Sequence, residues 1–284
     1  LMYHEIGEPE DEWVRTPENF RKDLQELYDA GYRAVSMNDV LDGRIDIPAG
    51  TTPVVLTFDD GRAGQFRYIE KEGELVMDPD CAVAILEEFY EAHPDFGLAA
   101  TFYLFYSGVP FGQPDLVQKK LDYLVERGFE IGNHTNSHPN LRNLSREAAI
   151  KDIALMVKKT QEYLPGYQVR SLALPMGAFP DDMSHIIAGQ HEGVSYRNEG
   201  ILLVGSNPAP SPFSRSFISA KIPRIRASEM KTDGVGLYEW LQVLRDNPER
   251  RYISDGNPAT VVVPEELREQ VNEEALRGKE LITY

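Results

Sequence analysis

The stretch of sequence that decides the fold is PVVLTFDDG, residues 53–61. Pro53–Phe58 is an apolar run rich in β-branched and aromatic residues, which is typical of a buried strand. Asp59, Asp60 and Gly61 end it with two adjacent carboxylates and a glycine. Adjacent strand residues face opposite sides, so one acid can hold a metal while the other accepts a proton from water. Because Asp and Gly also favour turns, this stretch alone leaves a purely structural role open.

On both sides of this stretch, apolar runs alternate with amphipathic ones. Thr16-Pro17-Glu18 has the pattern of a helix start, and Ser145 is expected to cap a long helix that reaches about Leu164. Alternating strands and helices predict an α/β fold with a mostly parallel sheet, and the number of units suits a closed or nearly closed barrel. We expect residues 1–284 to form a single domain. Further strands are predicted at 98–105, 129–132, 169–174 and 260–263, and further helices at 79–90, 116–126, 237–244 and after Pro264.

Composition excludes some classes of partner. The net charge of −17 argues against nucleic acid, because phosphate binding requires a basic surface. A neutral polysaccharide or oligosaccharide is compatible with this charge. No apolar run reaches the roughly 18 residues of a spanning helix, so no transmembrane segment is predicted. The single cysteine, Cys81, allows no disulfide within the chain and is expected to be buried.

A second group of polar residues follows the predicted strand at 129–132. His134 and His138 are four residues apart in the sequence His134-Thr135-Asn136-Ser137-His138. Imidazole nitrogens suit zinc and other divalent transition metals, and two histidines with one carboxylate leave positions open for water and substrate. Three further histidines, His93, His185 and His191, lack a carboxylate at ligand spacing and are expected at the surface.

Together these two motifs resemble the polysaccharide deacetylase (NodB-homology) family. The resemblance rests on Thr57–Gly61 followed by His134–Pro139, and it implies a distorted (β/α) barrel. It also implies that Asp59 is the general base of a hydrolase. In the same way, it implies that Asp60, His134 and His138 bind a divalent metal ion, with zinc expected and cobalt or nickel as alternatives.

The chain departs from the pattern of this family at two places. A third motif, Arg-x-Pro-x-Gly, appears as 173–177, with Ala173 where the arginine is usual. By resemblance, the backbone N–H of Met176 helps to hold the developing oxyanion. The usual C-terminal histidine is also missing. A branch that includes the poly-N-acetylglucosamine deacetylases instead opens with a Tyr-His-x-Ile-like segment, which here makes His4 the expected general acid. The late sequence Ile222-Pro223-Arg224-Ile225 makes Arg224 the expected replacement for the missing arginine.

The resulting prediction is metal-dependent hydrolysis of N-acetyl groups on a polysaccharide that contains N-acetylglucosamine. Three alternatives remain at this stage: an O-acetyl polysaccharide esterase, a catalytically retired glycan-binding protein, and a metal-dependent phosphoesterase. The negative charge speaks against the last. Because the chain begins at Leu1, we expect a segment upstream and an extracytoplasmic location, secreted or anchored through that segment. The sequence leaves the oligomeric state and the polymer open.

Overall fold

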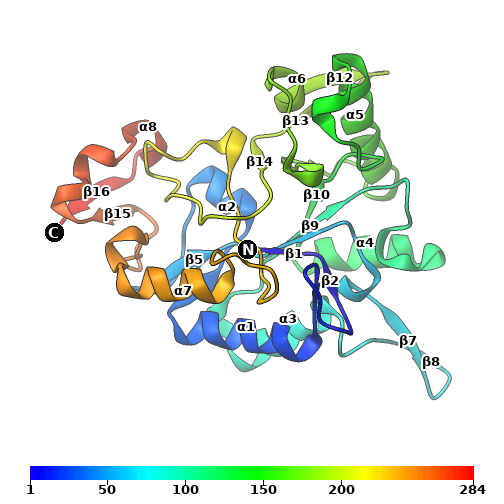
Figure 1. Ribbon diagram of the computed structural model, residues 1–284, viewed down its shortest axis with the longest axis horizontal. Helices are drawn as coiled ribbons and strands as arrows, with labels where there is room; N and C mark the ends of the chain where they lie inside the picture. Colours follow the sequence, from blue (N-terminus) through cyan, green and yellow to red (C-terminus); the bar gives the residue numbers. More distant parts are fainter.

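A curled parallel sheet forms the centre of the computed structural model, which describes residues 1–284 (Figure 1). Its six strands follow a spatial order in which the chain moves steadily around the sheet. In that order they are β1 (Met2–Tyr3), β6 (Thr57–Asp59), β9 (Thr101–Leu104), β10 (Glu130–Asn133), β11 (Ser171–Ala173) and β14 (Gly200–Leu202). All neighbouring pairs are parallel. The predicted α/β fold is confirmed.

An extended segment, residues 222–227, connects the two edges of this sheet. On one side, Ile222 N donates to Ile201 O and Leu203 N donates to Ile222 O, at 2.8 and 2.9 Å. On the other side, Met2 N donates to Ile225 O at 2.8 Å, and Ala227 N donates to Met2 O at 3.1 Å. The segment therefore closes the sheet into a distorted barrel and places Arg224 in the closing position.

The predicted strand at residues 53–58 is divided in the structure. Thr57–Asp59 joins the central sheet as β6, whereas Thr52–Val54 forms β5 and pairs with β4 (Tyr32–Ala34) outside it. Pro53 lacks a backbone N–H, so it is tolerated in a two-stranded edge. The other small sheets pair β2 (Glu5–Ile6) with β3 (Val14–Arg15), β7 (Tyr68–Lys71) with β8 (Glu74–Met77), β12 (Ala188–His191) with β13 (Val194–Arg197), and β15 (Thr260–Val263) with β16 (Glu280–Thr283).

The chain has eight α-helices, and most of them surround the barrel, as Figure 1 shows. They are α1 (Pro17–Asp29), α2 (Met37–Asp42), α3 (Ala82–Ala92), α4 (Val117–Glu126), α5 (Arg146–Tyr163), α6 (Ser184–Ile187), α7 (Leu237–Asp246) and α8 (Glu273–Leu276). The predicted caps form: Thr16 Oγ1 accepts from Asn19 N, and Ser145 Oγ accepts from Ala148 N. None of these helices combines the length and apolar character that crossing a bilayer requires.

The strands bury both of their faces. Outside the barrel, the Tyr3, Phe58 and Phe102 rings stack in sequence beneath the helices, with centroid distances of 5.3 and 5.0 Å. Inside it, Tyr103 packs with a smaller apolar group that includes Ala173. Gly132 lies beside the Tyr103 ring, where a Cβ atom would be 2.3 Å from Cε1. A glycine is therefore required at this strand position.

A small C-terminal unit packs beside the barrel, on the side of α2 and β5 (Figure 1). Its own apolar cluster includes Phe213, Val261 and Val271. The helix expected after Pro264 is instead a 3-10 turn, Glu265–Gln270, followed by the short α8. The single-domain assignment of residues 1–284 stays a prediction.

Candidate active site

The predicted site residues meet at one edge of the barrel, where the parallel strands end. The register pairs Tyr3 with Phe58, so the next residues, His4 and Asp59, are neighbours on adjacent strands. Because the Tyr3 and Phe58 rings point outward, alternation directs His4 and Asp59 toward the barrel interior. His134 follows the last residue of β10 at the same edge. This convergence is expected, because α/β barrels form their sites beyond the carboxyl ends of strands.

Asp60, His134 and His138 form a compact cluster. Asp60 Oδ1 lies 3.3 Å from His134 Nε2 and 3.4 Å from His138 Nε2. Donor atoms about 2.0–2.1 Å from a tetrahedral metal ion lie roughly 3.3–3.4 Å from one another. Asp60 Oδ1 is also buried without a hydrogen-bond donor within the protein. A divalent cation at the centre would satisfy this oxygen, so the donor set fits a metal ion.

The surroundings of the cluster favour metal ligation. His134 Nδ1 lies 2.8 Å from Ala173 O, and donation to that carbonyl leaves the lone pair of Nε2 directed at Asp60. The other carboxylate oxygen, Asp60 Oδ2, accepts from Arg62 Nε at 3.0 Å. Burial acts to raise the pKa of Asp60, but the neighbouring His134 and Arg62 outweigh it and the pKa is lowered. Asp60 is therefore ionised, as a metal ligand must be.

Three residues that the sequence analysis did not identify hold the histidine loop. Asp152 on α5 accepts from the backbone N–H of Asn136 and of Ser137, both at 3.0 Å. Asn133 Oδ1 accepts from Thr135 N at 2.7 Å, and Thr135 Oγ1 accepts from His138 N at 3.0 Å. These bonds fix a loop in which His138 has a positive φ of 55°. Asp152 lies outside the motif, on the helix that follows it, and the fold brings its carboxylate to the loop.

Asp59 is held by the residue that the sequence suggested as a substitute. Arg224 donates to both carboxylate oxygens of Asp59, from Nη1 and Nη2, each at 2.7 Å. Its Nε donates to Leu203 O and its Nη1 also donates to Thr57 Oγ1. Burial acts to raise the pKa of Asp59, but Arg224 and His134 outweigh it and the net shift is downward. Asp59 is thus a buried carboxylate that stays ionised and oriented.

Ala173, which stands where the family pattern has an arginine, lies in apolar surroundings. Ala173 is fully buried and packs against Tyr103, Leu202 and Ile222 inside the barrel. The Arg224 guanidinium lies 5.9 Å from the centroid of the Tyr103 ring, so the interior beside Asp59 is already filled from the closing segment. The carbonyl of Ala173 contacts the site through His134.

His4 lies next to the acid pair in a largely enclosed position. Burial lowers the pKa of His4 to about 4, although the carboxylates of Asp59 and Asp60 act to raise it. The imidazole is therefore neutral at rest near pH 7. Gln65, another residue missed in the sequence, donates from Nε2 to His4 O at 2.7 Å and to Asp59 O at 2.5 Å. This amide ties the ends of β1 and β6 together.

Met176 lies in the turn Pro175–Gly177, which follows β11. Its φ is 57° and its side chain is 62% exposed. The amides of Gly177 and Ala178 donate to the carbonyls of Leu174 and Pro175 and so close the turn. The Met176 N–H makes no such bond within the turn.

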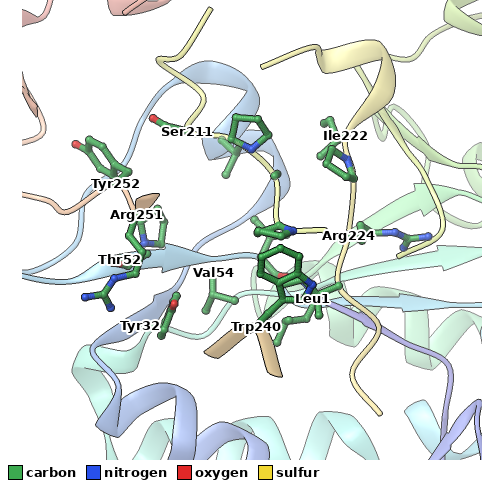
Figure 2. A pocket seen from close by; sticks show the side chains of 18 of the residues that line it. Leu1, Tyr32, Thr52, Val54, Ser211, Ile222, Arg224, Trp240, Arg251 and Tyr252 are labelled. Carbon is green, nitrogen blue, oxygen red and sulfur yellow. The ribbon is translucent and has the colours of Figure 1, made fainter. Parts of the chain in front are cut away.

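A separate cavity of about 180 Å³ lies between the barrel and the C-terminal unit (Figure 2). Its wall is mostly apolar and includes Val54, Ile222 and Trp240. None of the three metal-cluster residues lines it. Arg224 is at its border, with the guanidinium pointing away from the centre of the cavity in Figure 2. The cavity is therefore distinct from the cluster at the strand ends.

Comparison with known proteins agrees with this architecture. A family model described as polysaccharide deacetylase matches residues 46–189, just over half of the chain. The chitooligosaccharide deacetylase of Sinorhizobium fredii is 25% identical over 179 residues, which cover 63% of this chain and 68% of that protein.

Two solved structures share the fold. Streptococcus pyogenes deacetylase PplD, in complex with acetate, superposes with a TM-score of 0.62 at 19% identity, over 85% of this chain and 95% of that one. IcaB from Ammonifex degensii gives a TM-score of 0.57 at 18% identity, over the same shares of the two chains. The predicted fold class and hydrolase class are confirmed. The chain belongs to the polysaccharide deacetylase family.

Proposed function

We propose that this protein removes N-acetyl groups from a polysaccharide that contains N-acetylglucosamine and releases acetate. The observation that carries the proposal is the placement of an ion-paired carboxylate, Asp59, beside the cluster of Asp60, His134 and His138 at one barrel edge. A base next to a metal site is one arrangement that can hydrolyse an amide. The chitooligosaccharide substrate in the name of the Sinorhizobium relative supports the choice of an N-acetylated sugar.

The ligand set supports a divalent transition metal. Two imidazoles and one carboxylate suit zinc, and they also accept cobalt or nickel. A bound ion would supply Lewis acidity toward the acetyl carbonyl and would lower the pKa of water.

Each remaining residue has one proposed task. Asp59 accepts a proton from the attacking water, and Arg224 holds its carboxylate in place. The N–H of Met176 donates to the acetyl oxygen as negative charge develops on it. His4 then protonates the nitrogen, which leaves as the free amine.

The low pKa of His4 constrains this sequence of proton transfers. Because the imidazole is neutral at rest, His4 must gain its proton during the reaction. The proton that Asp59 removes from water is the one that the leaving nitrogen needs. Since His4 directly follows β1 and Asp59 ends the adjacent β6, we propose that His4 passes this proton on.

Because a neutral His4 is a weaker source of protons, O-deacetylation is the second candidate function. An alkoxide leaves more easily than an amide nitrogen, so an ester requires less help from an acid. The retired glycan-binding alternative loses its main support, because Arg224 supplies the guanidinium that Ala173 lacks.

The test is acetate release from N-acetylglucosamine oligomers and from O-acetylated xylan oligomers. It is run before chelation, after chelation, and with zinc, cobalt or nickel added back. Release from the N-acetylated oligomers that stops on chelation and returns with metal is expected. Release only from O-acetylated oligomers would select the esterase, and release from neither substrate with any metal would contradict both. An extracytoplasmic location stays a prediction.

A further inference from the structure

Trp13 lies at the border of the candidate site but takes no part in the chemistry above. It belongs to the turn between β2 and β3, and its side chain is 41% exposed. Its ring centroid is 4.7 Å from that of His4, with an interplanar angle of 59°. An exposed indole therefore lies directly beside the proposed proton donor.

The position of Trp13 is fixed by charged groups rather than by the apolar core. The Arg226 guanidinium lies 5.0 Å from the centroid of the indole. Arg226 is itself held by Glu12 Oε1 at 2.6 Å and by Met230 O at 3.0 Å, and Lys231 Nζ lies 3.1 Å from Glu12 Oε2. The backbone of the turn is tied to β2, because Glu5 N donates to Trp13 O at 3.1 Å. The indole is thus presented to solvent in one orientation.

Trp13 is in none of the apolar clusters, and much of its surface remains in contact with water. An aromatic side chain that is already held rigid loses little conformational entropy when a ligand covers it. Tryptophan has a broad apolar face together with an N–H donor, which matches the apolar C–H face and the hydroxyl groups of a pyranose ring.

We propose that Trp13 is the stacking platform for the sugar ring next to the one that is deacetylated, and so determines the preference for oligomers over single sugars. This inference rests on the proposed function. Arg226 is the positioning residue for the platform, two residues after Arg224 in the closing segment. The segment that orients Asp59 thereby also supports the substrate contact.

The kinetic test compares Trp13→Ala and Trp13→Phe with the parent enzyme on N-acetylglucosamine oligomers of increasing length. Trp13→Ala is expected to raise KM for the tetramer and pentamer about tenfold or more, with a smaller effect on kcat, as loss of one stacking contact predicts. Trp13→Phe should recover most of the affinity. Trp240→Phe is the matched control, since Trp240 is the only other tryptophan and lines the separate cavity.

The alternative is that Trp13 merely supports His4. In that case kcat would fall by the same factor for every oligomer length while KM stayed unchanged, and the proposal would be wrong.

A binding test gives a readout that does not depend on turnover. In the Trp240→Phe, Asp59→Asn protein, Trp13 is the only tryptophan. The tetramer is titrated into this protein while the tryptophan emission is followed. A saturable change supports the platform. Acetate release by the parent enzyme together with no change in emission would overturn the platform but leave the proposed function standing, whereas no acetate release would count against the function itself.

Discussion

Arg224 and Asp59 are separated by 165 residues of sequence and form a two-point ion pair inside the barrel, with both N···O distances at 2.7 Å. Two parallel hydrogen bonds fix the plane of a carboxylate as well as its charge. The pair also contacts Thr57 and the carbonyl of Leu203, so the closing segment and the start of the motif share one polar network.

Arg224→Met should lower kcat about 100-fold or more, because a misplaced base loses the alignment on which proton transfer depends. It leaves Asp59 buried without a partner, which also predicts a loss of about 3–5 kcal/mol in the free energy of unfolding. Steady-state kinetics and chemical denaturation measure the two effects. Arg224→Lys should recover little activity, since an ammonium group cannot form the two-point contact. Wild-type kcat in either variant would remove Arg224 from the mechanism.

Asp59 and Asp60 should respond differently to the same change. Asp59→Asn is expected to abolish turnover while metal affinity, measured by calorimetry, stays within a few-fold of wild type. Asp60→Asn should weaken metal binding about 100-fold or more, because it removes the charged ligand of the cluster. Loss of metal from Asp59→Asn would instead make Asp59 a ligand.

His4→Ala should discriminate between leaving groups. We expect amide hydrolysis to fall about 100-fold or more, within the usual range for loss of a general acid. Hydrolysis of an aryl acetate should fall much less, because a phenolate leaves without protonation. Equal losses on both substrates would show that His4 supports the site structurally rather than donating a proton.

Gly132→Ala tests the packing inside the barrel. The added methyl group would lie 2.3 Å from the ring of Tyr103, so we expect a loss of about 1–3 kcal/mol in the free energy of unfolding. Gly7→Ala is the control, since its nearest neighbour would be 3.6 Å away. Thermal or urea unfolding compares the two variants. Equal stability of both would mean that Tyr103 can move aside.

Lys120 gives a prediction about pH. Its side chain is fully buried, its Nζ donates to Phe111 O at 2.9 Å, and burial lowers its pKa to about 8. Cys81 acts to raise this pKa and Arg67 to lower it further. Between about pH 8 and 10.5 the unfolded chain therefore holds a proton on Lys120 that the folded chain has released. The contribution of Lys120 to the free energy of unfolding should rise with pH across this window, by about 1.4 kcal/mol per pH unit.

Lys120→Met removes this titration and provides the comparison. Urea unfolding at intervals from pH 7 to 10.5 should show the stability difference between wild type and variant shifting in favour of the wild type as the pH rises. A constant difference would mean that the Lys120 pKa is the same in the folded and unfolded chains.

The sequence predicted those parts of the protein that are local in the chain. The caps at Thr16 and Ser145 form because a hydroxyl and the amide three residues later suffice to make them. The Asp59-Asp60 and His134–His138 motifs converge because each follows a strand of the same parallel sheet. His185, which was expected at the surface, is only 5% exposed, so that prediction was wrong. An isolated polar residue in a sequence does not reveal which elements will cover it.

The parts that were not predictable depend on distant contacts. Gln65 and Asp152 belong to no recognised motif. Their contacts with Asp59 and with the histidine loop arise because η1 (Ala63–Gln65) and α5 lie against the strand ends. The division of residues 53–58 into two strands depends on β4, a partner that the stretch itself does not contain.

The closing segment sets a lower limit on how far the protein can be shortened. The portion that matches the family, residues 46–189, contains Asp59 and all three residues of the metal cluster but neither His4 nor Arg224. A fragment cut to those boundaries would also expose the edges of β6 and β11 that β1 and β14 cover in the whole chain. If catalytic competence were judged from residues 46–189 alone, Ala173 would count as the loss of the family arginine. The guanidinium that pairs with Asp59 comes from Arg224, which lies outside that portion, so the arrangement at Asp59 depends on the closing segment as well as on the matched stretch of sequence.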